Sequence, residues 1–337
     1  MTSHPEFGER TPGSLAASAF ASQIRGKTIL ITGVSPKGIG ASTAAALAPH
    51  QPALLILASR TPSKLALVAS DLLATNPTLS LQIVPLDLSS QSAIRLAAAQ
   101  ISQITPRIDI LINNAGVVVT TRQATAEGIE FQFGTNHIGP FLLTNLLMPL
   151  LLKATENSKP GETRIVSLTS AGHRLSPIRW SDINFEEGKE VPPEEDHVKP
   201  LAGAFAKCTE DGYNGIVTYA QSKTANLLMT LELQRRLKEK GVVGYALHPG
   251  SIETELSRHQ DDELNAQFLK VASYWKTPDE GSSTTIVAAL DPALNEIKGL
   301  YLDNCQFKDP APHASDPVAA ERLWKLSEEL VGQKFDL

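Results

Sequence analysis

A tyrosine and a lysine one helical turn apart, Tyr219 and Lys223, are the residues of this sequence best suited to acid–base chemistry. In a helix, positions i and i+4 share one face, so the ammonium group of Lys223 can approach the phenol of Tyr219 and favour its ionised form. An unperturbed tyrosine has a pKa of about 10, so a lowered pKa would make it a better catalyst near neutrality. The alternative is a packed tyrosine beside a solvated lysine, and the surrounding sequence has to decide between the two.

Short apolar segments alternate with longer helical segments, which is typical of a parallel sheet covered by helices on both faces. We expect a single α/β domain of the doubly wound Rossmann type with a seven-stranded parallel sheet. The expected strands are 27–32, 53–58, 81–86, 108–112, 164–169, 242–248 and 299–303. A long helix is expected over 131–153, and another carries Tyr219 and Lys223 and ends near Gly241.

A glycine-rich turn, TGVSPKGIG at 32–40, follows the first expected strand. Glycines let the backbone approach a pyrophosphate, and the free amide groups at the start of the next helix can bind its charge. The strand-turn-helix setting therefore predicts a dinucleotide site rather than an ordinary turn. The contacts expected in this turn are Gly33, Ser35, Lys37, Gly38, Ile39 and Gly40.

No aspartate or glutamate occurs from Ala41 to Ser70, where an acidic residue would bind the ribose hydroxyls of NAD. Arg60 at the end of the second expected strand, with Lys37 in the glycine-rich turn, instead supplies positive charge for a 2′-phosphate. The sequence therefore favours NADP(H) as cofactor. The alternative for Arg60 is a solvated surface arginine, which would weaken only the choice between the two cofactors.

Two further segments at strand ends are expected to contact the adenosine half of the cofactor. A carboxylate after the third strand can accept a hydrogen bond from the adenine amine, or alternatively cap a helix. The small residues of the tetrapeptide NNAG, which closes the fourth strand, let the backbone lie against the ribose. The expected contacts are Asp87, Leu88, Asn114, Ala115 and Gly116.

With these segments in this order, residues 25–305 resemble the short-chain dehydrogenase/reductase family. The greatest similarity is to the branch of the retinol dehydrogenases and the WW-domain oxidoreductase, including fungal members, and it is carried by Ala58-Ser59-Arg60, Asn136-His137-Ile138-Gly139 and Trp275-Lys276-Thr277-Pro278. The resemblance implies a catalytic tetrad of Asn136, Ser170, Tyr219 and Lys223. It also implies nicotinamide contacts from Thr254 and the segment before it, with Pro249, Gly250 and Ile252.

Three departures from the family pattern are visible. Four residues separate Gly33 from Gly38, where the family usually has three, so the phosphate turn should bulge. An insertion near 175–215 lies between the implied catalytic serine and tyrosine and should shape the substrate entrance. Pro140 has no N–H to bond the Asn136 carbonyl in an α-helix, so we hypothesise that it keeps this carbonyl open for the proton relay that the family implies.

The implied reaction is NADPH-dependent reduction of a carbonyl, or oxidation of the alcohol, with Tyr219 as general acid or base. Ser170 would hold the substrate oxygen, with Thr169 as the rival for this role, and Lys223 would also bind the nicotinamide ribose. The expected pocket segments contain no arginine cluster, which favours a lipophilic or polycyclic ketone of secondary metabolism. His137 and His173 are interpreted as hydrogen-bonded structural residues rather than as additional acids.

Two other classes of function stay open. A non-redox epimerase or cyclase could use the same tyrosine as an acid, and an NADP-binding regulatory protein could be built on the same fold. Stoichiometric consumption of NADPH would separate a reductase from either alternative.

Composition excludes several kinds of partner. The 337 residues carry a net charge of -6 and no dense run of lysine and arginine, so we expect no nucleic-acid binding. Cys208 and Cys305 lack metal-ligand spacing, so no metal site is expected. Residues 1–24 are expected to form a loose N-terminal arm before a domain over 25–337, and the apolar stretch 141–152 is too short to span a membrane. We therefore expect a cytoplasmic protein. The family resemblance suggests a homodimer that pairs through the two long helices.

Overall fold

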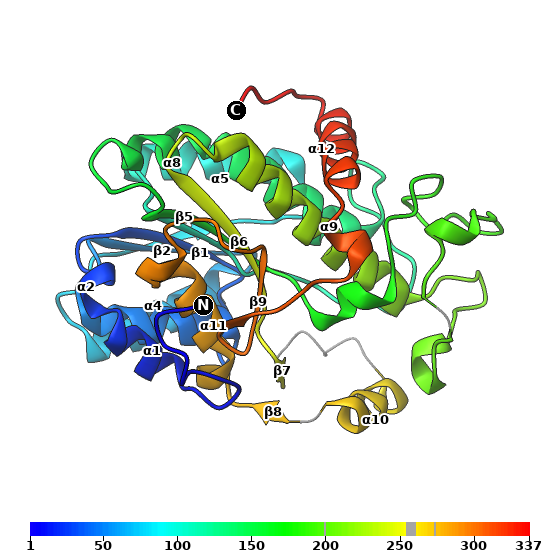
Figure 1. Ribbon diagram of the computed structural model, residues 1–337, viewed down its shortest axis with the longest axis horizontal. Coiled ribbons are helices and arrows are strands. Elements are labelled where there is room, and N and C mark those ends of the chain that lie inside the picture. Colours follow the sequence, from blue (N-terminus) through cyan, green and yellow to red (C-terminus); the bar gives the residue numbers. More distant parts are fainter. Residues whose placement is uncertain (199, 254–260, 273) are drawn as a thin grey trace.

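The computed structural model describes residues 1–198, 200–253, 261–272 and 274–337. In this part of the chain a central sheet has helices on both faces (Figure 1), with the strand order β10-β9-β6-β5-β4-β1-β2-β3. The strands are β1 (Thr28–Thr32), β2 (Leu54–Ser59), β3 (Leu81–Pro85), β4 (Ile110–Asn113), β5 (Thr163–Leu168), β6 (Val242–His248), β9 (Tyr301–Asp303) and β10 (Gln306–Phe307). The chain order reverses between β1 and β4, which is where doubly wound sheets form their ligand crevice.

The seven expected parallel strands are confirmed, and the sheet has one strand more than expected. The additional strand, β10, pairs antiparallel with β9 through a turn in which Asn304 and Cys305 have φ values of 49° and 66°. Two residues are too few to show an alternating pattern in the sequence. A separate parallel pair, β7 (Ser251–Ile252) with β8 (Trp275–Lys276), was likewise not expected.

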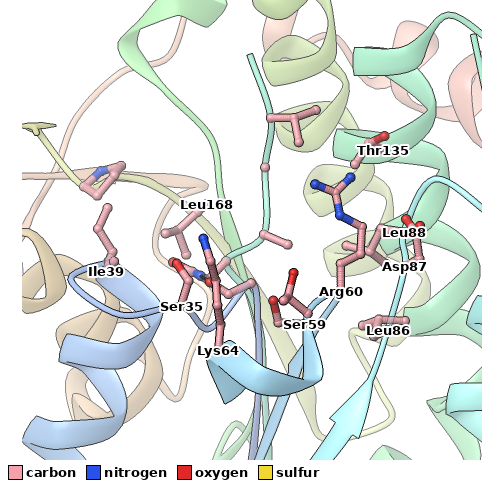
Figure 2. Close-up of a pocket in the computed structure, with 18 of the residues that line it drawn as sticks. Ser35, Ile39, Ser59, Arg60, Lys64, Leu86, Asp87, Leu88, Thr135 and Leu168 are labelled. Atoms are coloured by element: carbon pink, nitrogen blue, oxygen red, sulfur yellow. Dashed lines mark hydrogen bonds between the residues drawn. The ribbon is translucent and has the colours of Figure 1, made fainter. Parts of the chain in front are cut away.

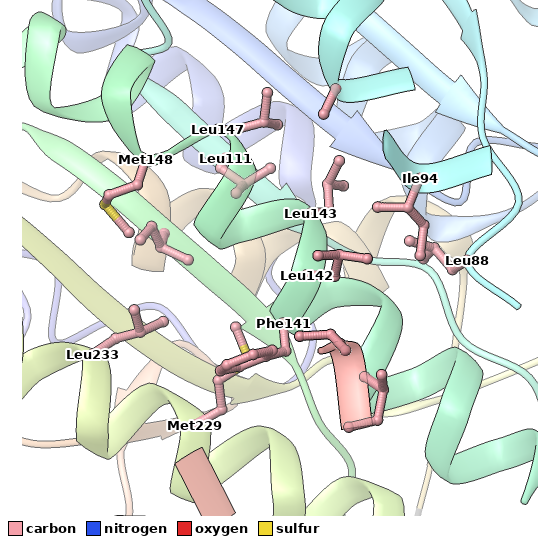
Figure 3. Packing of buried hydrophobic residues seen from close by; sticks show 14 of the residues in the cluster. Leu88, Ile94, Leu111, Phe141, Leu142, Leu143, Leu147, Met148, Met229 and Leu233 are labelled. Atoms are coloured by element: carbon pink, nitrogen blue, oxygen red, sulfur yellow. The ribbon is translucent and has the colours of Figure 1, made fainter. Parts of the chain in front are cut away.

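Each face of the sheet carries its own apolar core. On one face, the core residues come from α5 (Gln91–Ile104), α7 (Gly139–Leu146), α9 (Gly215–Leu237) and α12 (Pro317–Val331), with Phe141 and Met229 among them (Figure 3). On the other face, they come from α1 (Gly13–Ala19), α3 (Ile39–Leu47), α4 (Pro62–Thr75) and α11 (Pro278–Leu290). All five residues of β1 are buried between the two cores.

The helix expected over 131–153 is broken into several segments. A short helix, α6 (Phe131–Phe133), leads into a π-helical turn over Gly134–Ile138, followed by α7 and α8 (Met148–Thr155). The axis bends by 53° between Phe131–Leu146 and α8. Pro149 lies in the first turn of α8, where its missing N–H costs nothing, and this explains why the continuous helix was the wrong expectation.

No single helix within the described ranges has both the length and the apolar character required to cross a membrane. The bent pair Phe131–Leu146 and Met148–Thr155 meets these requirements only when its two parts are taken together. Residues 132–145 of this pair are buried inside the fold, which is the arrangement of a core helix.

The N-terminal arm is packed, so the expectation of a loose arm is wrong. Helix α1 lies against α11 and α3, and Phe20 after it is only 3% exposed. Near the start of the chain, the backbone N–H and the hydroxyl of Ser3 donate to the Asp291 carboxylate at 2.7 and 2.6 Å. Because four of the nine apolar residues of this arm are alanines and they form no continuous apolar run, the sequence contains only a weak signal for their burial.

We expect Phe20→Ala to lower the free energy of unfolding by about 3 kcal/mol, because the side chain leaves a cavity in a core that cannot fully close. Leu15→Ala is the matched control, since Leu15 on α1 is 53% exposed and should change stability by less than about 0.5 kcal/mol. Chemical denaturation of both variants measures the difference. Equal stability of the two variants would show that the arm does not contribute to the core.

Candidate active site

A pocket lies at the carboxyl ends of β1, β2 and β4, in the crevice where the strand order reverses (Figure 2). Most of the residues expected to contact the cofactor line it. They are Gly33, Ser35, Gly38, Ile39, Arg60, Asp87, Leu88, Asn114, Ala115, Gly116, Tyr219, Lys223 and Pro249. Segments spread over two thirds of the sequence therefore meet at one cavity, as the doubly wound fold requires.

The turn after β1 is held against the turn after β4. Gly33 has a φ of 72°, and a Cβ atom there would lie 2.5 Å from the Ala115 Cα atom. The Asn114 side chain donates to the carbonyls of Thr32 at 2.7 Å and Gly33 at 3.2 Å. A Cβ atom on Gly40 would lie 2.7 Å from the Asn114 Nδ2 atom, so Gly40 permits this close packing. Gly40 is not among the residues that line the pocket, so its expected role as a cofactor contact stays a prediction.

The extra residue in the glycine-rich turn changes the role of Lys37. Lys37 adopts a left-handed conformation with φ of 61°, and its side chain is exposed and does not line the pocket. The expectation that it supplies charge to the cofactor site is therefore not supported. Gly250 and Ile252 also lie outside the pocket lining, and Thr254 falls outside the described residues.

A second cation, which was not recognised from the sequence, accompanies Arg60. Lys64 lies in the first turn of α4, four residues after Arg60, and both side chains line the pocket (Figure 2). Ser59 and Thr61 line the same end. The sequence contains the information that places Lys64 in this pocket, because the first turn of a helix that directly follows a strand lies at the carboxyl end of that strand.

The residues of the implied tetrad converge beside this pocket. A Cβ atom on Gly116 would lie 3.3 Å from the Lys223 Nζ atom and 3.6 Å from the Asn136 Oδ1 atom, so the two side chains meet at this glycine. Asn136 accepts from the Val117 N–H at 2.7 Å and donates to the Ser222 hydroxyl at 3.0 Å. It thereby ties the turn after β4 to α9.

Helix α9 presents Tyr219 and Lys223 as expected. Its first turn is capped by Asn214, whose side chain accepts from the N–H groups of Ile216 and Val217 at 3.0 Å each. The Lys223 ammonium donates to the Leu168 carbonyl at 3.1 Å and lies 5.4 Å from the centre of the Tyr219 ring.

Burial governs the protonation of this pair. Burial raises the pKa of Tyr219 to about 12, although a hydrogen bond with Ser170 acts in the opposite direction. Burial also lowers the pKa of Lys223 to about 8. The expectation of a tyrosine pKa below its ordinary value is therefore not met in this structure, because the loss of water around the phenolate has the larger effect. The phenol is protonated at neutral pH, which is the form that can donate a proton.

The structure distinguishes Ser170 from its rival Thr169. The Thr169 hydroxyl donates to the Lys223 carbonyl at 2.7 Å and is committed to that bond. The Ser170 hydroxyl accepts from the Gly172 N–H at 3.0 Å and bonds with Tyr219. Ser170 is therefore the hydroxyl that shares a site with the tyrosine.

The π turn around Asn136 changes the premise of the Pro140 hypothesis. The Gly139 N–H bonds to the Gly134 carbonyl, five residues earlier, so the ladder is shifted by one residue from the α-helical register. In this shifted register, an N–H at position 140 would bond to the carbonyl of Thr135, and proline has no N–H to form that bond. The sequence argument assumed an α-helical register, which this turn does not have, and the proposed role of Pro140 in the proton relay stays a prediction.

The insertion near 175–215 lies beside α10 (Asp262–Val271). Phe205 of the insertion packs edge-on against Phe268 of α10 with ring centres 5.0 Å apart. Both rings join an apolar cluster that includes Leu175 and Ile216, and Ile216 precedes Tyr219 by three residues on α9. The insertion therefore contributes apolar surface close to the N-terminal part of α9.

The other residues singled out in the sequence have structural surroundings. The fully buried His137 lies 2.8 Å from the Ser327 hydroxyl through Nε2, and burial lowers its pKa to about 3. In the ranges that the structure describes, no three side chains of histidine, cysteine, aspartate or glutamate are grouped to hold a metal ion.

Similarity to known proteins agrees with this geometry. The chain matches the family model for short chain dehydrogenases over residues 27–181. It is 37% identical to retinol dehydrogenase 13 of Homo sapiens over 315 residues, covering 92% of this chain and 86% of that protein. The chain belongs to the short-chain dehydrogenase/reductase family. The expected resemblance to the retinol dehydrogenases is confirmed.

This short-chain dehydrogenase/reductase has fungal and structural relatives as well. It is 34% identical to the oxidoreductase fscI of Fusarium equiseti, over 72% of this chain and 94% of that protein. A crystal structure of an uncharacterised protein from Mycobacterium paratuberculosis matches with a TM-score of 0.67 and 28% identity, over 94% of this chain and 98% of that one. The Pseudomonas aeruginosa RhlG/NADP complex matches in fold, with a TM-score of 0.60 at 21% identity, over 83% and 95% of the two chains. Family membership makes the protein an oxidoreductase that interconverts carbonyls and alcohols.

We expect kcat/KM for carbonyl reduction to fall as the pH rises through about 8, because Lys223 then loses its ammonium charge while Tyr219 stays protonated. Lys223→Arg should have lower activity but no such decline near this pH, since a guanidinium keeps its proton. Initial rates between about pH 6 and pH 10 measure both profiles. The same alkaline decline in the two proteins would assign it to another group.

Proposed function

We propose that the protein is an NADPH-dependent reductase of lipophilic or polycyclic ketones. The observation that carries the proposal is the convergence of Tyr219, Lys223, Asn136 and Ser170 beside a crevice whose far end is lined by Arg60 and Lys64. The first four residues suit proton transfer to a substrate oxygen, and the two cations suit a phosphate group.

The residues lining the pocket fit a dinucleotide phosphate. Gly33 and Gly38 leave two positions of the turn before α3 without a side chain, and Gly38 and Ile39 at the N-terminus of α3 line the pocket. Arg60 and Lys64 would hold the 2′-phosphate through charge-assisted hydrogen bonds. When bound, NADPH supplies the hydride for the reaction.

The catalytic contribution of the chain is proton donation in a site with little water. Tyr219 holds its proton at neutral pH and would transfer it to the substrate oxygen as negative charge develops there. The hydroxyl of Ser170 would stabilise the same oxygen. The Lys223 ammonium, fixed by the Leu168 carbonyl, places positive charge beside the phenol and would favour the phenolate left after transfer.

The surroundings favour an apolar substrate. Leu175, Phe205 and Phe268 belong to the same apolar cluster as Ile216, which precedes Tyr219 by three residues on α9, and these three come from the insertion and α10. Several relatives are named as retinol dehydrogenases, and retinol is a lipophilic alcohol. A lipophilic ketone fits both observations.

The direct test is NADPH oxidation by the purified protein with a panel of aldehydes, aliphatic ketones, quinones and polycyclic ketones. We expect turnover with the polycyclic and other lipophilic ketones and at least a thousandfold loss of kcat in Tyr219→Phe, which removes only the proton donor. Lack of stoichiometric NADPH oxidation with every carbonyl would contradict the proposal. Substrate turnover without NADPH consumption would favour an epimerase or cyclase, and tight NADPH binding without any turnover would favour a regulatory role.

We expect Arg60→Ala and Lys64→Ala each to raise KM for NADPH by about tenfold or more while changing KM for NADH by less than about threefold, because each loses a charge-assisted bond to the 2′-phosphate. Lys37→Ala is the matched control, since the exposed Lys37 side chain does not line the pocket. Steady-state kinetics with both cofactors make the comparison. Equal losses for NADPH and NADH would contradict the assignment of these cations to the 2′-phosphate.

A further inference from the structure

His173 is a fully buried histidine in the 3-10 turn Ala171–Leu175, three residues after Ser170. Both nitrogen atoms of its ring have partners. Nδ1 lies 2.6 Å from the Ser170 carbonyl oxygen, and Nε2 accepts a hydrogen bond from the Ala311 N–H at 3.1 Å. The ring therefore connects the turn of the catalytic serine to a segment 138 residues further along the chain.

The partners determine where the ring proton lies. A backbone N–H can only donate, so the Nε2 atom facing Ala311 must be unprotonated. The proton of the neutral ring is therefore on Nδ1, from which it is donated to the Ser170 carbonyl. Burial lowers the pKa of His173 to about 4, which keeps this neutral form at physiological pH.

The hydrogen bond from Nδ1 to the Ser170 carbonyl stabilises the turn that orients the serine hydroxyl. The Ser170 carbonyl also accepts from the His173 backbone N–H at 3.1 Å, and the Ser170 hydroxyl oxygen accepts from the Gly172 N–H at 3.0 Å. A Cβ atom on Gly172 would lie 3.4 Å from the Ser170 Oγ atom and 3.6 Å from the Tyr219 Cε1 atom. The closed turn therefore lies directly against the tyrosine ring, and a small rotation of it would displace the hydroxyl.

The imidazole itself is fixed by its surroundings. Its ring packs edge-on against the Tyr301 ring with centres 5.2 Å apart. The His173 carbonyl accepts from the Thr224 hydroxyl at 3.0 Å and from the His313 Nε2 atom at 2.8 Å. Strand β9, helix α9 and the segment after β10 thus all hold this residue in place.

We propose that His173 is a positioning residue for the reaction, holding the backbone of Ser170 so that its hydroxyl stays beside Tyr219 and the substrate oxygen. This inference rests on the proposed role of Ser170 in binding that oxygen. His173 does not touch the reacting atoms in this arrangement, and it acts only through the serine turn.

Two substitutions, each of which keeps one of the two hydrogen bonds of the His173 ring, distinguish a positioning role from an effect on stability alone. In His173→Asn, the amide N–H group can take the place of Nδ1–H and keep the bond to Ser170. In His173→Gln, the longer side chain places its amide oxygen near Nε2, so it keeps the bond from Ala311 and loses the one to Ser170. We expect kcat to fall about 10- to 100-fold in His173→Gln and less than about threefold in His173→Asn, because small displacements of a reacting group are costly.

In the same variants, KM for the ketone and Kd for NADPH should change by less than about threefold, since His173 does not line the pocket. His313→Ala is the control for a general loosening of the segment around Ala311. This substitution leaves both hydrogen bonds of the His173 ring in place, and Thr224 still donates to the His173 carbonyl. The kcat should therefore stay within about twofold of the wild type. Equal kcat in the asparagine and glutamine variants would overturn the positioning role.

Crystal structures of the two variants provide a test that does not depend on turnover. We expect the Ser170 hydroxyl to shift by more than about 0.5 Å relative to Tyr219 in His173→Gln and to stay in place in His173→Asn. An unmoved hydroxyl in His173→Gln overturns the inference. If the wild type reduces no carbonyl, the proposed function fails, and the crystal structures still decide whether His173 positions the serine.

Discussion

Gly33 and Ala115 bring two backbone turns so close together that no side chain fits between them. The turn after β1 and the turn after β4 are joined there by the hydrogen bonds that the Asn114 side chain donates. This contact fixes the crevice between the two halves of the sheet, and the remaining residues of the site are attached to it. Asn136 bonds to the segment just after Gly116, and Lys223 lies against the same glycine. A side chain at Gly33 would therefore disturb cofactor binding and catalysis together.

The burial of α9 has a comparable effect on the chemistry. Tyr219 and Lys223 are both withdrawn from water, so each group is pushed toward its neutral form. In bulk water the pair would be almost entirely phenol and ammonium near neutrality. Within the fold, burial raises the pKa of the phenol and lowers the pKa of the ammonium group. The site therefore holds a protonated phenol beside an ammonium group whose pKa is lowered to about 8.

The sequence predicted those parts of the site that depend on local chemistry. The helix with Tyr219 and Lys223, the parallel strands and Arg60 follow from spacing and from turn residues. Lys37 is exposed and adopts a left-handed conformation in the turn with one additional residue, and spacing alone does not show this. Lys64 could have been predicted as well, because it lies in the first turn of the helix that follows the strand ending near Arg60. The packing of the arm around Phe20 depends on contacts with α3 and α11, which are distant in sequence.

Helix α12 completes the core on the face of α7 and α9. Trp324 packs edge-on against Phe141 with ring centres 4.9 Å apart, and the Arg236 guanidinium of α9 lies 4.4 Å from the centre of the Trp324 ring. Phe335, after the helix, packs on the same phenylalanine. During synthesis on the ribosome, this half of the apolar core stays uncovered until the residues through 335 have emerged. From the time α9 has emerged until residues through 335 have emerged, the nascent chain therefore exposes this apolar surface, and chaperones can bind it in that interval.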